Sequence, residues 1–149
     1  DRFVGSNRAA ALAAVRRGAA EAKVPIRLSW TPGSLGTFDI AVEPPSDERS
    51  GARADVMTAV VEDGLKTPVT RGENTGRTLR HAAVVRELRQ AGTTDARGRF
   101  GKTVTININP AWNRPATRFV VFLQRRNLGR IVGAASLPFE PGPPHPTGR

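Results

Sequence analysis

A chain of 149 residues with 38% hydrophobic residues is long enough for one domain with a core and too short for two of ordinary size. The absence of cysteine excludes disulfides, cysteine-ligated zinc and thiol nucleophiles, and no apolar run approaches the ~20 residues of a membrane span. Aromatic residues make up 5% and tyrosine is absent, which argues against a stacking surface for nucleic-acid bases.

The net charge of +10 comes from 23 basic and 13 acidic residues, and most of the basic residues are arginine. A surface with this charge attracts phosphates, anionic lipids or an acidic protein. Alternatively, arginine has replaced lysine through the codon usage of a GC-rich genome, and the arginines only form a solvated surface. The scattering of the arginines along the chain favours this second interpretation.

The first predicted element is a helix from Ser6 to about Ala22, with Ser6 as its N-cap. Its apolar side chains, Leu12 and Val15 among them, form only a narrow stripe, so we expect the helix to lean on something larger. Pro25 ends the pattern. The five residues before the helix resemble the middle of a domain, which suggests a processed chain or a fragment.

Beyond Pro25, short apolar runs with strand periodicity alternate with turns rich in proline and glycine. The segment 78–88 suits a helix or a strand, and the β context on both sides favours a strand. The last two runs predict a terminal hairpin around the turn 127–129. Besides 78–88, strands are predicted within 24–30, 38–42, 54–61, 66–71, 102–109, 117–124 and 130–137.

About seven short strands at this spacing predict a mainly β fold, an antiparallel β-sandwich preceded by one α-helix. The proline-rich tail, residues 138–149, is expected to be extended or disordered. Trp112 stands between two prolines, where a plug for the end of the sandwich is favoured over a binding anchor.

The segment 71–81 is the densest in functional groups. Its two glycines allow sharp turns that leave backbone amides open to an anion, and Arg71 and Arg77 are suited to gripping a carboxylate or phosphate. Alternatively, Glu73 pairs with an arginine, Asn74 takes a left-handed turn position, and the segment only locks a loop.

His81 has the chemistry of a general base near neutral pH, but a lone histidine in a β segment is more often packed or at the surface. His145 lies in the tail, far from His81 in the sequence. Two distant histidines without cysteine argue against a transition-metal site. The glycine pattern lacks the lysine of a phosphate loop. We therefore predict no cofactor, no metal and no catalytic residue.

Four stretches occur together in an order that resembles the bacterial secreted proteins of domain-of-unknown-function family 1223. The resemblance extends to about Ala135, and its most specific part is the arginine-glycine-glutamate-asparagine stretch. The four stretches are Phe3-Val4-Gly5-Ser6-Asn7-Arg8-Ala9-Ala10, Arg71-Gly72-Glu73-Asn74-Thr75-Gly76-Arg77-Thr78-Leu79, Val84-Val85-Arg86 and Gly129-Arg130-Ile131-Val132-Gly133-Ala134-Ala135.

The resemblance implies a longer, periplasmic or secreted bacterial protein with a thioredoxin-like unit, which contains a cysteine motif, and a β-rich domain after it. Residues 1–23 would then be the last strand edge and helix of that unit, and residues 24–137 the β domain. The cysteine motif is missing here, so the implied thiol oxidoreductase activity carries over to no residue of this chain.

The function predicted from these observations is a non-catalytic β domain that binds or positions a partner beside the thioredoxin-like unit. The partner would be a protein or a small anionic ligand, and nucleic acid is disfavoured. The alternative is a basic subunit or fragment of a larger assembly that meets an acidic surface. The predicted binding residues are Arg71, Glu73, Asn74, Arg77, His81 and Arg86.

Overall fold

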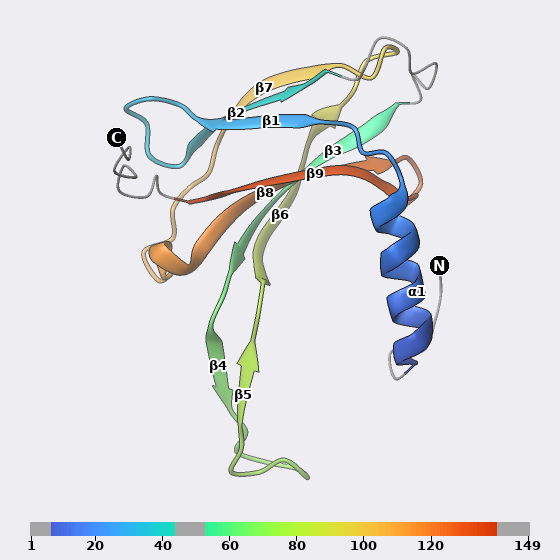
Figure 1. Cartoon of the computed structure of the whole chain (residues 1–149). Coiled ribbons are helices and arrows are strands. Elements are labelled where there is room, and N and C mark those ends of the chain that lie inside the picture. Colours follow the sequence, from blue (N-terminus) through green and yellow to red (C-terminus); the bar gives the residue numbers. More distant parts are fainter. Residues whose placement is uncertain (1–6, 44–52, 140–149) are drawn as a thin grey trace, which may run out of the picture.

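Two antiparallel sheets face each other in the computed structural model, which describes residues 7–43 and 53–139 (Figure 1). One helix precedes them, and a two-stranded ribbon extends away from them. The elements are α1 (Arg8–Ala20), β1 (Ile26–Trp30), β2 (Thr37–Val42), β3 (Ala54–Glu62), β4 (Leu65–Pro68), β5 (Thr78–His81), β6 (Val84–Thr93), β7 (Phe100–Thr105), the 3-10 turn Arg114–Ala116, β8 (Thr117–Arg125) and β9 (Ile131–Pro138).

The first sheet has the strand order β1-β2-β7 and the second the order β6-β3-β8-β9, with antiparallel pairing throughout. These seven strands confirm the predicted mainly β fold with one leading helix. The ambiguous segment 78–88 contains strands β5 and β6, so the preference for strand was correct. The terminal hairpin is also present, as β8 and β9.

The core lies between the two sheets and centres on stacked aromatic rings. The centroids of Phe38 in β2 and Phe119 in β8 are 4.1 Å apart with nearly parallel planes, and the rings of Phe38 and Phe139 pack edge to face with centroids 5.6 Å apart. Alternate residues of these strands point inward, as strand geometry requires. The other fully buried side chains are Leu123, Val42, Val56, Val60, Val121 and Thr117.

Trp112 closes one end of the sandwich, as its position between two prolines predicted. Its ring is half-buried and meets the edge of Phe139 at 6.3 Å. The sandwich also continues two residues past its predicted end at 137: Pro138 ends β9, and the Phe139 N–H donates to the Thr117 carbonyl at 2.9 Å. The rest of the predicted tail, residues 140–149, lies outside the described residues.

Helix α1 is shorter than predicted, and its cap is a different residue. The Asn7 side chain accepts a hydrogen bond from the Ala10 N–H at 3.0 Å, while Ser6, the predicted cap, lies outside the described residues. No residue of the helix is buried. The helix is also neither long enough nor apolar enough to cross a membrane.

The face that α1 turns toward the sandwich differs from the predicted stripe. Ala14 and Gly18 are half-buried, whereas Leu12 and Val15 are exposed. The expectation that the stripe leans on a larger surface is therefore not met within residues 7–43 and 53–139. The reason is geometric: α1 is attached only near its C-terminal end, where Glu21 pairs with Arg130 at 2.7 Å, and it projects away from the sheets (Figure 1).

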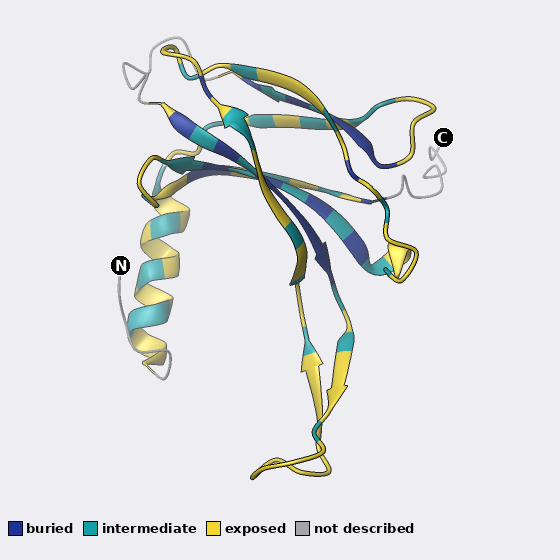
Figure 2. Cartoon of the chain, turned by 180° about the vertical axis from the view of Figure 1, so that it is seen from behind, coloured by how far each residue is buried: buried dark blue, intermediate teal, exposed yellow. Residues whose placement is uncertain are grey.

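The hairpin between β3 and β6 continues past the sandwich as the ribbon β4–β5, and we call residues 63–83 the arm. Two residues with positive φ lie where the arm begins and ends, Gly64 at 74° and Ala83 at 51°. The arm extends well beyond the two sheets, and its residues are mostly exposed (Figure 2). β4 ends at Pro68, so only the first part of the predicted strand 66–71 is paired.

Candidate functional site

The tip of the arm, residues 69–77, contains most of the predicted binding residues and is held in one shape by backbone hydrogen bonds. The Gly76 N–H donates to the Val69 carbonyl and the Val69 N–H to the Arg77 carbonyl, both at 2.9 Å. Gly72 and Gly76 have φ values of 87° and 83°, which only glycine adopts without strain. Asn74 does not adopt the left-handed conformation, so the glycines alone make the turns.

The ribbon and tip together carry a net positive charge. The ribbon and tip, residues 65–81, contain four basic residues and one acidic residue, a net charge of +3. Every residue from 71 to 80 is exposed. In the part of the chain that the structure describes, neither Arg71 nor Arg77 forms an ion pair with Glu73 or with another acidic side chain. The arginine–Glu73 pairing considered as an alternative is therefore absent.

His81 and Arg86 do not join the tip residues. His81 lies at the start of the ribbon, where its Nε2 is 3.0 Å from the Thr67 hydroxyl across the strand pair. No carboxylate among the described residues hydrogen-bonds to it, so it lacks the partner that would orient a general base. Arg86 belongs to β6, beyond the ribbon. The tip therefore contains Arg71, Glu73, Asn74 and Arg77.

Arg86 instead neutralises a buried carboxylate at the base of the arm. Its Nε donates to Glu62 Oε2 at 2.7 Å, and the side chains of Arg86 and Glu62 are 31% and 3% exposed. The Asn113 N–H donates to the other carboxylate oxygen at 3.1 Å. The hydrogen bond from Arg86 is the main cause that lowers the pKa of Glu62, against the opposing effect of burial.

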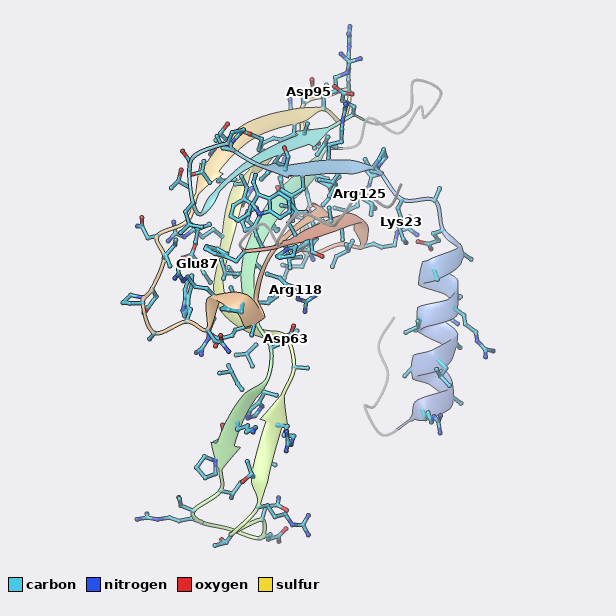
Figure 3. All side chains as sticks on the ribbon, turned by 60° about the vertical axis from the view of Figure 1, so that its left-hand side comes forward. Lys23, Asp63, Glu87, Asp95, Arg118 and Arg125 are labelled. Atoms are coloured by element: carbon cyan, nitrogen blue, oxygen red, sulfur yellow. The ribbon has the colours of Figure 1, made fainter. Side chains whose placement is uncertain are left out.

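Asp63, the next residue, holds the start of the arm through contacts with two different residues. Its Oδ1 accepts the Ala83 N–H at 2.7 Å, which joins the two strands of the arm where they leave the sandwich. Its Oδ2 accepts from Arg118 of β8 at 2.9 Å, and Figure 3 shows Asp63 and Arg118 side by side at the junction. Two adjacent carboxylates therefore connect the arm to β6, β8 and the turn at Asn113.

Sequence reasoning missed this junction. The strand predicted within 54–61 stops just before Glu62-Asp63-Gly64, and two carboxylates directly after the apolar run Ala59-Val60-Val61 are a signal in themselves. A carboxylate whose position in the alternation places it on the buried face of a strand needs a cation or an amide as its hydrogen-bond partner. The pattern indicates that a partner exists, but not that Arg86 and Asn113 supply it.

A hollow of about 510 Å³ lies between the end of α1 and the β8–β9 turn. Arg17, Lys23 and Arg130 contribute positive charge to its wall, but Glu21 pairs with Arg130 at 2.7 Å and with Lys23 at 3.9 Å. Its charge is thus partly neutralised within the chain, unlike that of the arm tip. Within the described ranges, no three histidine, aspartate or glutamate side chains gather into a metal-binding cluster.

A family model described as protein of unknown function (DUF1223) matches residues 1–124. That range contains α1, the whole arm and most of β8, while β9 lies beyond it. No curated protein and no solved structure matches the chain. Because the match covers well over half of its residues, the chain belongs to this family of uncharacterised function.

Proposed function

We propose that this chain is a non-catalytic binding domain that presents the arm tip to an anionic group on a protein partner or a small ligand. The observation that carries the proposal is the pair Arg71 and Arg77, exposed on a braced turn and without an acidic partner in the described parts of the chain. A rigid tip loses little conformational freedom on binding, and arginine pairs well with carboxylates and phosphates.

We further propose that the domain belongs to an exported bacterial protein with a thioredoxin-like unit, a proposal that rests on the resemblance described above. The exposed apolar stripe of α1 supports it, since such a stripe needs a sheet to pack against. The gene provides the test: we expect a cysteine pair and a signal segment upstream of Asp1. An upstream region with neither would leave the domain without its proposed redox neighbour.

The arm-tip proposal is tested with the double variant Arg71→Ala/Arg77→Ala and fluorescein-labelled poly-L-glutamate as the anionic probe. Fluorescence anisotropy at low salt should show an affinity about ten-fold below that of the unmodified domain, equivalent to ~1.4 kcal/mol. The melting temperature should stay unchanged, because both side chains are exposed and unpaired within the described residues.

The matched control is the double variant Arg97→Ala/Arg99→Ala, in the β6–β7 turn at the opposite end of β6 from the arm. It removes the same charge, and the Asp95 side chain that accepts the backbone N–H groups of both residues is kept. We expect a much smaller loss of affinity. If both double variants weaken binding equally, the probe reports net charge and the arm has no special role.

The alternative function, a basic subunit of a larger assembly, would use the charge of the whole surface. In that case the affinity for poly-L-glutamate should fall steeply with added salt and respond alike to arginines anywhere on the domain. The arm concentrates cations that have no acidic partner among the described residues, and this favours the more specific proposal.

A further inference from the structure

Strand β8 is apolar on both of its faces. The run Phe119-Val120-Val121-Phe122-Leu123 sends Phe119, Val121 and Leu123 into the core, where all three are buried. Val120 and Phe122 therefore point to the other side of the sheet, where they are half-buried and do not pack against the core. An antiparallel sheet that faces water on one side normally has polar residues there.

The apolar character continues across the neighbouring strands in register. Ala59 of β3 lies opposite both Val120 and Leu88 of β6, and Met57 lies opposite Phe122. Val61 lies opposite Val85. We call this surface of the four-stranded sheet, on the side away from β1, β2 and β7, the outer face. Its principal apolar residues are Met57, Val85, Leu88, Val120 and Phe122.

Polar contacts border the outer face at both ends. Asp55 accepts hydrogen bonds from Gln90 and Thr93 at one end, and Arg118 pairs with Asp63 at the other. Val85 and Leu88 are 54% and 55% exposed. An apolar centre with a polar rim is the usual composition of a protein interface, and an apolar patch of this kind marks an interaction site.

Two basic projections flank this surface. In the two opposite views, the sheet β1-β2-β7 lies above the four-stranded sheet, and both α1 and the arm extend below it (Figures 1 and 2). The ribbon and tip have a net charge of +3, and the helix contains three arginines and no acidic residue. A second copy of the chain would bring like charges against these projections, and each copy has a net charge of +10.

We propose that the outer face is a docking surface for an acidic polypeptide segment with apolar side chains, which the flanking cations orient. This proposal rests on the proposed function for the arm tip and extends it, because it names the surface that receives the apolar part of the partner. Charge complementarity selects the acidic polypeptide over a second copy of the chain.

The experiment uses labelled synthetic peptides about ten residues long, enough to span four strands ~4.8 Å apart and reach the flanks. The first peptide alternates leucine with glutamate, the second serine with glutamate, and the third leucine with lysine. Fluorescence anisotropy with the full chain should rank the leucine–glutamate peptide tightest. Equal affinity for the leucine–glutamate and serine–glutamate peptides would overturn the apolar part of the proposal.

The variant Val85→Ser/Leu88→Ser then locates the binding surface. Both side chains are more than half exposed, so the fold should tolerate the change. We expect an affinity for the leucine–glutamate peptide about ten-fold lower, from the apolar area withdrawn from the interface. Affinity for the serine–glutamate peptide should not change. The control is Leu35→Ser, an exposed leucine in the β1–β2 turn, which should leave both affinities unchanged.

The outcomes separate this proposal from the one for the arm tip. If Arg71→Ala/Arg77→Ala weakens the glutamate peptides and Val85→Ser/Leu88→Ser has no effect, the outer-face proposal is overturned and the arm-tip proposal stands. If the serine double variant weakens binding and the alanine double variant does not, the arm-tip proposal fails. Sedimentation that shows a dimer of the unmodified chain, lost in Val85→Ser/Leu88→Ser, would assign the outer face to a second copy instead.

Discussion

Replacing Phe139 by alanine is expected to lower the free energy of unfolding by about 3–5 kcal/mol, the usual cost of removing a buried phenylalanine. The side chain is fully buried and its ring packs edge to face with two others, with centroid distances of 5.6 Å to Phe38 and 6.3 Å to Trp112. The change would leave a cavity beneath Trp112 and remove both ring contacts. Urea unfolding monitored by tryptophan fluorescence measures the difference.

The control for Phe139→Ala is Leu128→Ala, which removes a large apolar side chain that is 90% exposed in the β8–β9 turn. We expect a change within about 0.5 kcal/mol of zero. A loss below about 1 kcal/mol for Phe139→Ala would contradict the position of its ring in the core, because no rearrangement of a filled core makes such a truncation neutral.

The burial of Phe139 is a feature of the fold that could not be predicted from the sequence. The strands were predictable because their apolar residues recur at strand spacing and glycine or proline separates them, as in Ile26 to Trp30 and Phe38 to Val42. Phe139 follows Pro138 and precedes a run of prolines, so its local sequence indicates a tail. Its burial depends on the facing ring of Phe38, a hundred residues earlier in the chain, which no local pattern encodes.

The candidate site was predictable in its chemistry and only partly in its geometry. The arginines and glycines of 71–77 indicated an exposed turn, and the structure places them on one. Arg86 was grouped with these residues only because it is close to them in the sequence. A β-ribbon rises about 3.3 Å per residue, so a few positions along it separate side chains widely. Arg86 therefore meets Glu62, its neighbour across β3 and β6, rather than the tip.

The outer face of the four-stranded sheet was visible in the sequence but was interpreted differently. The run Phe119 to Leu123 is apolar without alternation, a pattern typical of a strand buried on both sides. Among the described residues only one side of β8 packs into the core, and Val120 and Phe122 on the other side are half-buried. The apolar stripe of α1, with Leu12 and Val15 exposed, has the same character. Both features gain a physical explanation if this domain works against another polypeptide.

The second large effect is expected at the base of the arm, where Glu62→Ala should destabilise the fold by about 3 kcal/mol. Removing one partner of a buried ion pair leaves the other without compensation. Here Arg86 would lose its carboxylate and the Asn113 N–H its acceptor. The matched control is Glu43→Ala, which breaks the Arg27–Glu43 pair, whose side chains are 75% and 64% exposed. Its expected cost is below about 1 kcal/mol.

The pH dependence of stability tests the same pair through its charge. The hydrogen bond from Arg86 lowers the pKa of Glu62 in the folded state below its ordinary value of 4.5. The carboxylate therefore contributes its full stabilisation above that value and loses it as the pH falls through the lowered pKa. Glu62→Gln removes the charge and keeps the shape, so its destabilisation, measured by urea unfolding, should be largest near neutral pH and shrink in acid. A deficit that stays constant from pH 7 to about pH 3 would show that the charge of Glu62 contributes nothing to the stability of the fold.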